Sequence, residues 1–139
     1  MSGELRWQEV AQEDYVIDFN EIAGHETPHS VAYAVCYIRS ETDQRGLRML
    51  VSSDDEAKVY LNGKQIHTFP FSRGLLEDQD TVQDIALNAG LNVLVFKVVN
   101  EDFYWDGSIR FTDAQGNPVA GIKVTLDPDA KEKTEIKQP

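Results

Sequence analysis

The chain has 139 residues, enough to bury one hydrophobic core and too few for two ordinary domains. Its 24 acidic and 13 basic residues give a formal net charge of -11, and its Lys and Arg residues do not cluster, so nucleic acid and anionic membranes are disfavoured as partners. The apolar runs are too short to span a membrane, and residues 1–4 have neither the basic start nor the apolar run of an export signal.

Short apolar and apolar–polar runs follow one another along the chain, separated by turn residues every eight to twelve positions or so. The strands predicted in this way are residues 5–10, 15–19, 31–38, 47–51, 58–61, 64–66, 81–87, 91–99, 108–111 and 122–126. No segment shows a helical apolar period over about ten residues. The pattern therefore predicts an all-β fold, an antiparallel β-sandwich.

Two local features of the sequence predict a hairpin and the end of the domain. Asn62 and Gly63 stand between two strand-like runs, and both tolerate the positive φ of a type I′ turn, so the sequence predicts a hairpin there. Residues 127–139 are charged and lack an apolar period, which predicts a charged tail or linker stub. We expect a single β-sandwich domain over residues 1–126.

Two motifs carry a family resemblance. The sequence VYLNG at residues 59–63 leads into the hairpin, and LNAGLNVL at residues 87–94 opens a long strand. Together they resemble the galactose-binding-domain-like jelly roll, including the sugar-binding β-sandwich of family 2 glycoside hydrolases and carbohydrate-binding-module-like domains. DGSIRF at residues 106–111 is similar to the strand that closes such domains. Tyr60 stands where tryptophan is common in these families.

The resemblance, which covers roughly residues 5–126, implies a function as well as a fold. In family 2 enzymes the sandwich is an accessory domain and the catalytic carboxylates lie in a separate barrel. The implied function is a non-catalytic carbohydrate-binding-like module of a larger secreted enzyme, extracellular or periplasmic. Its expected partner is a polysaccharide, an oligosaccharide or the neighbouring catalytic domain. The alternative is a structural or protein-interaction β-sandwich without a small-molecule ligand.

No catalytic residue is predicted. With 24 acidic residues some carboxylate pair will always fit a hydrolase, and no nucleophile elbow, phosphate-binding loop or dinucleotide fingerprint occurs.

Asp54 and Asp55 form the acidic pair of greatest interest. Jelly-roll sugar-binding modules often hold a structural calcium ion, so the resemblance permits one at these aspartates. Calcium requires six to eight oxygen ligands, however, and no loop has a regular Asp-x-Asp-x-Asp-Gly spacing. The alternative is that the two aspartates cap the strand and turn by accepting backbone N–H bonds, with Lys58 or Arg110 as an ion-pair partner.

The predicted sugar-binding residues lie in two aromatic loops and are Phe71, Arg73, Tyr104 and Trp105. Tyr104 or Trp105 would stack on a sugar ring, and the Arg73 guanidinium would donate hydrogen bonds to hydroxyls. Three consecutive aromatic residues, 103–105, cannot all point into a core. The alternative interpretation is that these rings plug the open end of the sandwich.

Overall fold

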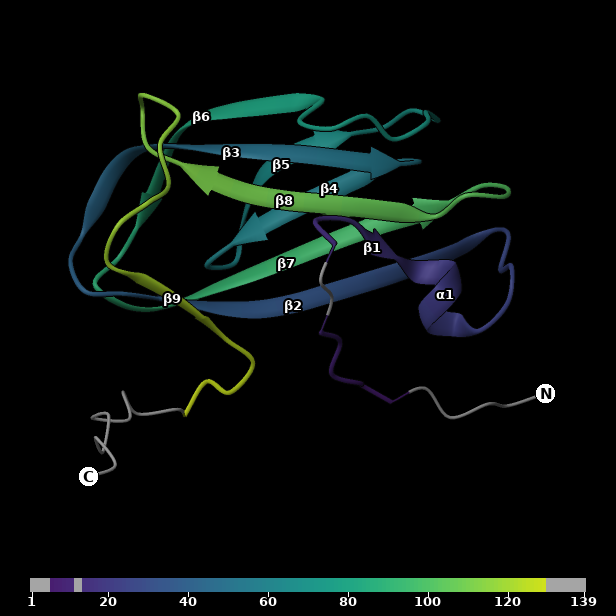
Figure 1. Ribbon diagram of the computed structural model, residues 1–139, viewed down its shortest axis with the longest axis horizontal. Helices are drawn as coiled ribbons and strands as arrows, with labels where there is room; N and C mark the ends of the chain where they lie inside the picture. The colour runs from purple at the N-terminus through teal and green to yellow at the C-terminus, as the bar shows by residue number, and fades with distance from the viewer. Residues whose placement is uncertain (1–5, 12–13, 130–139) are drawn as a thin grey trace.

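Two antiparallel sheets packed face to face form the molecule, as the computed structural model shows for residues 6–11 and 14–129 (Figure 1). A four-stranded sheet has the order β1-β8-β3-β6, and a five-stranded sheet has the order β5-β4-β7-β2-β9. The elements are β1 (Ile17–Asp18), α1 (Phe19–Ala23), β2 (Ser30–Ser40), β3 (Gln44–Asp54), β4 (Ala57–Leu61), β5 (Lys64–Phe69), β6 (Asp80–Leu87), β7 (Gly90–Asn100), β8 (Asp106–Thr112) and β9 (Ile122–Thr125). The predicted all-β antiparallel sandwich is confirmed.

Two predicted strands at the start of the chain are wrong in part. Residues 6–11 form no regular structure, and Leu5 lies outside the described residues. In the second segment only Ile17 and Asp18 are in a strand, because the Asp18 carboxylate accepts the Glu21 N–H and starts the five-residue helix α1. The predicted domain boundary after residue 126 stays a prediction, since residues 130–139 lie outside the described part.

The predicted Asn-Gly hairpin is confirmed. Asn62 and Gly63 have φ values of 52° and 80°, and Leu61 pairs with Lys64 across the turn. The buried Asn92 side chain secures this corner, because its Oδ1 accepts hydrogen bonds from the Asn88 backbone N–H and from Asn62 Nδ2, both at 2.9 Å. Satisfying these polar groups is what allows an amide to be fully buried here.

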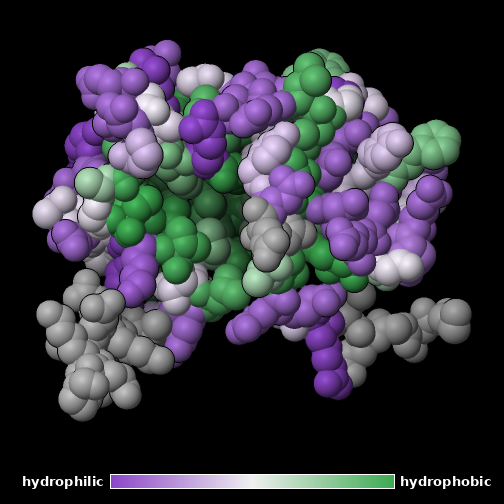
Figure 2. All heavy atoms as spheres, viewed as in Figure 1, coloured by the Kyte–Doolittle hydropathy of each residue, from purple (hydrophilic) through white to green (hydrophobic). Residues whose placement is uncertain are grey.

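The core lies between the sheets. Leu94, Phe96 and Val98 alternate with outward residues along β7, and they face Met49 and Val51 of β3, which are completely buried. Figure 2 shows apolar side chains gathered around a hollow in the viewed face, with hydrophilic residues around them. Within the described residues, no helix has the length and apolar character needed to cross a bilayer.

Candidate functional site

Three aspartates form a row across the four-stranded sheet. Asp18 of β1 pairs with Asp106 of β8, and Asp106 in turn pairs with Asp54 of β3. Residues directly opposite one another in antiparallel strands point to the same face of the sheet. The register of three separate strand ends thus brings three carboxyl groups together, which we call the aspartate row.

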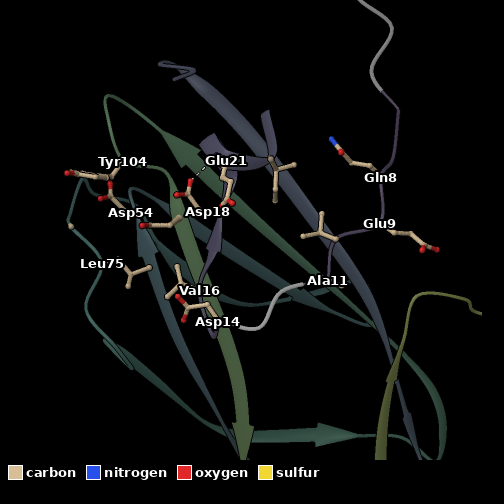
Figure 3. A pocket seen from close by; sticks show the side chains of 14 residues that line it. Gln8, Glu9, Ala11, Asp14, Val16, Asp18, Glu21, Asp54, Leu75 and Tyr104 are labelled. Carbon is tan, nitrogen blue, oxygen red and sulfur yellow. Dashed lines mark hydrogen bonds between the residues drawn. The ribbon is translucent and has the colours of Figure 1, made fainter. Parts of the chain in front are cut away.

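The aspartate row lines a cavity of about 1060 Å³. Residues 8–11 of the first segment form one side of this cavity, and Leu75 and Tyr104 approach from two loops (Figure 3). In Figure 3 Tyr104, Asp54 and Asp18 lie near one another, whereas Gln8 and Glu9 stand on the opposite side. The cavity combines an aromatic ring, several carboxyl groups and a few aliphatic side chains.

Burial raises the pKa of two of these carboxyl groups, so that they bind protons more tightly than an exposed aspartate does. The pKa of Asp54, which is only 8% exposed, is raised to about 7, mainly by burial and then by the neighbouring Asp55 and by Asp106. The pKa of Asp106 is raised to about 6 by burial, with Asp18 and Asp55 adding to the effect. One Asp106 carboxyl oxygen, Oδ1, is buried without a hydrogen-bond partner among the described residues. Near neutral pH the row is therefore a mixture of hydrogen-bond donors and acceptors.

Asp55 has a different role from its neighbour. Its Oδ1 accepts hydrogen bonds from Ser72 Oγ at 2.7 Å and from the Arg73 backbone N–H at 3.3 Å, and its Oδ2 accepts the Glu101 N–H at 2.8 Å. The carboxylate thereby joins two loops to the end of β3. The expectation that an aspartate caps this turn by accepting N–H bonds is confirmed for Asp55.

The ion-pair partners proposed for Asp54 and Asp55 are wrong. Arg110 pairs with Asp78 at 2.6 Å, and Lys58 lies on β4 in the other sheet.

The aspartate pair also does not fit the calcium site that the resemblance permits. Both Asp55 oxygens already accept hydrogen bonds, from Ser72 Oγ and from the Glu101 backbone N–H. In residues 6–11 and 14–129 no three His, Cys, Asp or Glu side chains are arranged to hold a metal ion.

Arg73 is an anchor for its loop, which corrects the role predicted for it. Its Nη1 and Nη2 donate to the two carboxyl oxygens of Asp80 at 2.8 and 2.6 Å, and its Nε donates to the Ser53 carbonyl at 3.1 Å. The guanidinium carbon also lies 3.7 Å from the centre of the Phe69 ring. These internal contacts occupy the donors that sugar hydroxyls would need.

Trp105 is buried and likewise corrects its predicted role. It is 6% exposed, its Nε1 donates to the Val98 carbonyl at 3.1 Å, and its ring centre lies 5.3 Å from that of Phe19. A ring in this position cannot stack on a ligand. Trp105 instead fits the alternative interpretation, in which an aromatic ring closes the open end of the sandwich.

Tyr104 and Phe71 are the two predicted residues whose rings are free to meet a ligand, being 75% and 66% exposed. Tyr104 lines the cavity with the aspartate row, whereas Phe71 lies outside that lining and packs edge-on against Phe69. Asn20 of α1 holds the Tyr104 loop through a 2.6 Å hydrogen bond from its Nδ2 to the Phe103 carbonyl. Of the four predicted residues, the structure thus brings only Tyr104 to the cavity.

Asp18 and Asp106 were missed as site residues by sequence reasoning. Their pairing depends on a two-residue strand and on contacts between residues far apart in the chain, which a local pattern does not reveal. The only signal was the position of each aspartate next to a strand end.

Comparison with known proteins does not identify the function, so the function has to be inferred from this site. No protein-family profile and no curated protein matches the sequence. A solved structure of a family 35 carbohydrate binding module from an environmental isolate is similar, with 24% identity, 75% of this chain and 78% of that chain covered, and a TM-score of 0.49. A likeness this low carries no functional argument. The two antiparallel sheets show the β-sandwich that the sequence predicts, and nothing finer about the family.

Proposed function

We propose that the chain is a non-catalytic carbohydrate-binding-like module and that the cavity beside Tyr104 is its sugar site. One observation carries the proposal: an exposed tyrosine ring stands at a cavity that also contains the aspartate row. Sugars present an apolar C–H face and several hydroxyl groups. An aromatic ring together with polar groups that fix orientation is the combination expected for such ligands.

The chemistry of the aspartate row favours a neutral sugar. Asp106 Oδ1, buried and without a partner in the described residues, is an acceptor for a sugar hydroxyl. A protonated Asp54 would donate to a ring or hydroxyl oxygen, because its pKa is about 7. Further carboxylates at Asp14 and Glu21 line the same cavity and would repel an anionic ligand.

The setting we infer for this function is an accessory domain of a larger secreted enzyme, extracellular or periplasmic. The volume of about 1060 Å³ is at the upper end of the range usual for small-molecule sites, which suits part of an oligosaccharide. The cavity offers a binding surface, and we assign no residue in it to bond cleavage. Incubation with model glycosides, followed by product analysis, tests this non-catalytic assignment.

A glycan array of neutral sugars, followed by titration calorimetry of the best ligand, tests the proposal. Tyr104→Ala should weaken binding about tenfold, which corresponds to roughly 1.4 kcal/mol. Phe71→Ala is the matched control, because it removes a similarly exposed ring that does not line the cavity. An array without any signal, or an equal loss in both variants, would contradict the proposed site.

A further inference from the structure

The acidic residues of this protein avoid one of its two sheets. No Asp or Glu occurs in the five strands of the five-stranded sheet. The basic residues in these strands are Arg39, Lys58, Lys64, Lys97 and Lys123. The four-stranded sheet, in contrast, includes acidic residues in β1, β3, β6 and β8. The strands of the five-stranded sheet therefore have basic residues and no acidic ones, in a protein whose net charge is -11.

The outward side chains of this sheet follow from its alternation. Residues 92, 94, 96, 98 and 100 of β7 are buried, so residues 91, 93, 95, 97 and 99 point away from the core. Lys97 pairs with Tyr33 of β2 on one side and with Lys58 of β4 on the other. These three residues form one cross-strand row on the outer surface, which we call the lysine row.

The lysine row places two like charges directly opposite each other, an arrangement that is destabilising in a sheet. Neither ammonium group lies within 4.0 Å of a carboxylate in the part of the chain that the structure describes. Lys97 Nζ is instead 5.9 Å from the centre of the half-exposed Tyr33 ring. The carboxylate of Glu56, which interacts electrostatically with Lys97, offsets this repulsion only in part, because it is a single negative charge beside two positive charges.

A shallow pocket of about 180 Å³ lies beside this pair. Lys58 and Lys97 line it together with apolar residues, among them Phe69 and Val99, and with the single carboxyl group of Glu56. Glu56 interacts electrostatically with Lys97 and also with Glu101. The pocket thus holds two positive charges against one negative charge, with an apolar wall.

Tyrosines extend the surface beyond the pocket. Tyr37 is four residues from Tyr33 on β2, a separation of roughly 13 Å along the strand. Tyr60 of β4 lies in the row next to the lysine row, opposite Val95. A linear polymer following β2 would meet two rings in succession, which suits a chain of sugar rings better than a single small anion.

We propose that this surface binds an anionic polysaccharide, a sugar chain bearing carboxylate or sulfate groups. Lys58 and Lys97 would hold an acidic group at the pocket, and Tyr33 would stack on an adjacent sugar ring. This inference rests on the proposed function in one respect, namely that the ligand is a sugar. Its site is separate from the Tyr104 cavity, whose carboxyl groups favour neutral sugars.

Affinity electrophoresis and calorimetry with polygalacturonate, dextran sulfate and neutral dextran test this inference and distinguish the two sources of charge. We expect binding to one or both charged polymers, weakening with added salt because the contacts are ionic, and we expect that any binding of dextran is unaffected by replacing the two lysines. Lys58→Gln combined with Lys97→Gln should weaken binding by roughly tenfold or more. Replacing Lys64 and Lys123 by Gln is the matched control, with the same change of charge in the same sheet outside the lysine row.

Each outcome bears on the site. Equal losses in the two double variants, no binding to either charged polymer, or binding only to phosphatidylglycerol vesicles would overturn it. Tyr104→Ala should leave binding of the charged polymer unchanged, so that failure at the cavity and failure at the lysine row are distinguishable. Because the Gln replacements remove a like-charge contact, the melting temperature of the Lys58/Lys97 variant should not fall. A loss of binding in this variant can then be attributed to the lysine row and not to unfolding.

Discussion

Asp54 at the end of β3 lies directly opposite Asp106 at the start of β8, and the Asp106 charge helps to raise the pKa of Asp54. Two acidic side chains in this arrangement make the folded state hold protons more tightly than the unfolded chain does. The arrangement therefore costs stability at neutral and alkaline pH. This cost is consistent with a role for the row in binding rather than in folding.

Asp54→Asn should stabilise the protein at alkaline pH. The pKa of Asp54 is about 7 in the folded protein, above the ordinary value of 3.8. The stability that Asp54 contributes by binding a proton is therefore fully present below pH 3.8 and is lost as the pH rises through 7. An amide resembles the protonated acid at every pH, and we expect a gain on the order of 2 kcal/mol at alkaline pH that vanishes in acid. Urea unfolding of both proteins across this range measures the difference.

Asp84→Asn is the control for that experiment, because Asp84 is an exposed carboxylate of β6 outside the cavity and Asn tolerates its positive φ of 58°. Asp78, Asp80 and Asp113 have lowered pKa values and contribute the opposite pH trend, but the wild-type protein and both variants share them. A stability difference for Asp54→Asn that stays constant with pH would refute the assignment.

Arg73→Lys should lower stability without changing sugar affinity at the Tyr104 cavity. Lysine cannot reproduce the two parallel hydrogen bonds to Asp80, and a cost of about 1–3 kcal/mol is expected for a half-buried charged pair. Arg110→Lys provides the comparison, since its bond pair to Asp78 is more exposed and should be worth less than about 1 kcal/mol. Equal costs of the two substitutions in chemical denaturation would contradict the anchoring role of Arg73. A loss of sugar binding in Arg73→Lys alone would restore the hypothesis that this arginine binds the ligand.

The two tryptophans should behave oppositely in fluorescence. Trp105 is buried against Phe19, whereas Trp7 is 77% exposed. Trp7→Phe should therefore leave a blue-shifted emission that acrylamide quenches poorly, and Trp105→Phe should leave a red-shifted emission that it quenches readily. A neutral sugar at the Tyr104 cavity should not shield Trp105 further. If quenching of Trp105 equals that of Trp7, the ring is accessible and its stacking role returns.

Local chemistry explains which parts of this fold the sequence could predict. Residues 31–38 and 91–99 lie within β2 and β7 because long apolar runs favour burial in a sheet, and the Asn62-Gly63 turn follows from its own φ preferences. Helix α1 has five residues, too few for an apolar period, although the flanking Asp18 and Gly24 are recognisable caps. Elements that depend on their own side chains were thus predictable.

The site was less predictable because it depends on register and on one unusual backbone angle. Phe103 has a φ of 64°, and along this loop Tyr104 is exposed while the adjacent Trp105 enters the core. No sequence pattern tells two consecutive aromatic residues apart in this respect. The aspartate row likewise requires three strand ends to be aligned by long-range pairing, as the partners of Asp106 show.

Gly107 tests the packing that supports the aspartate row. It follows Asp106 in β8, and a Cβ atom built on it would lie 2.8 Å from the Phe96 ring, closer than side chains tolerate. Gly107→Ala should therefore destabilise the protein by about 1–3 kcal/mol in urea unfolding, as overpacking does. Phe96→Leu should reduce that penalty in the double variant because it removes the ring. Gly74→Ala, where no atom lies within 4 Å of the added Cβ and φ is not positive, should be close to neutral, and a similar cost at both glycines would show that the contact with Phe96 is not the cause.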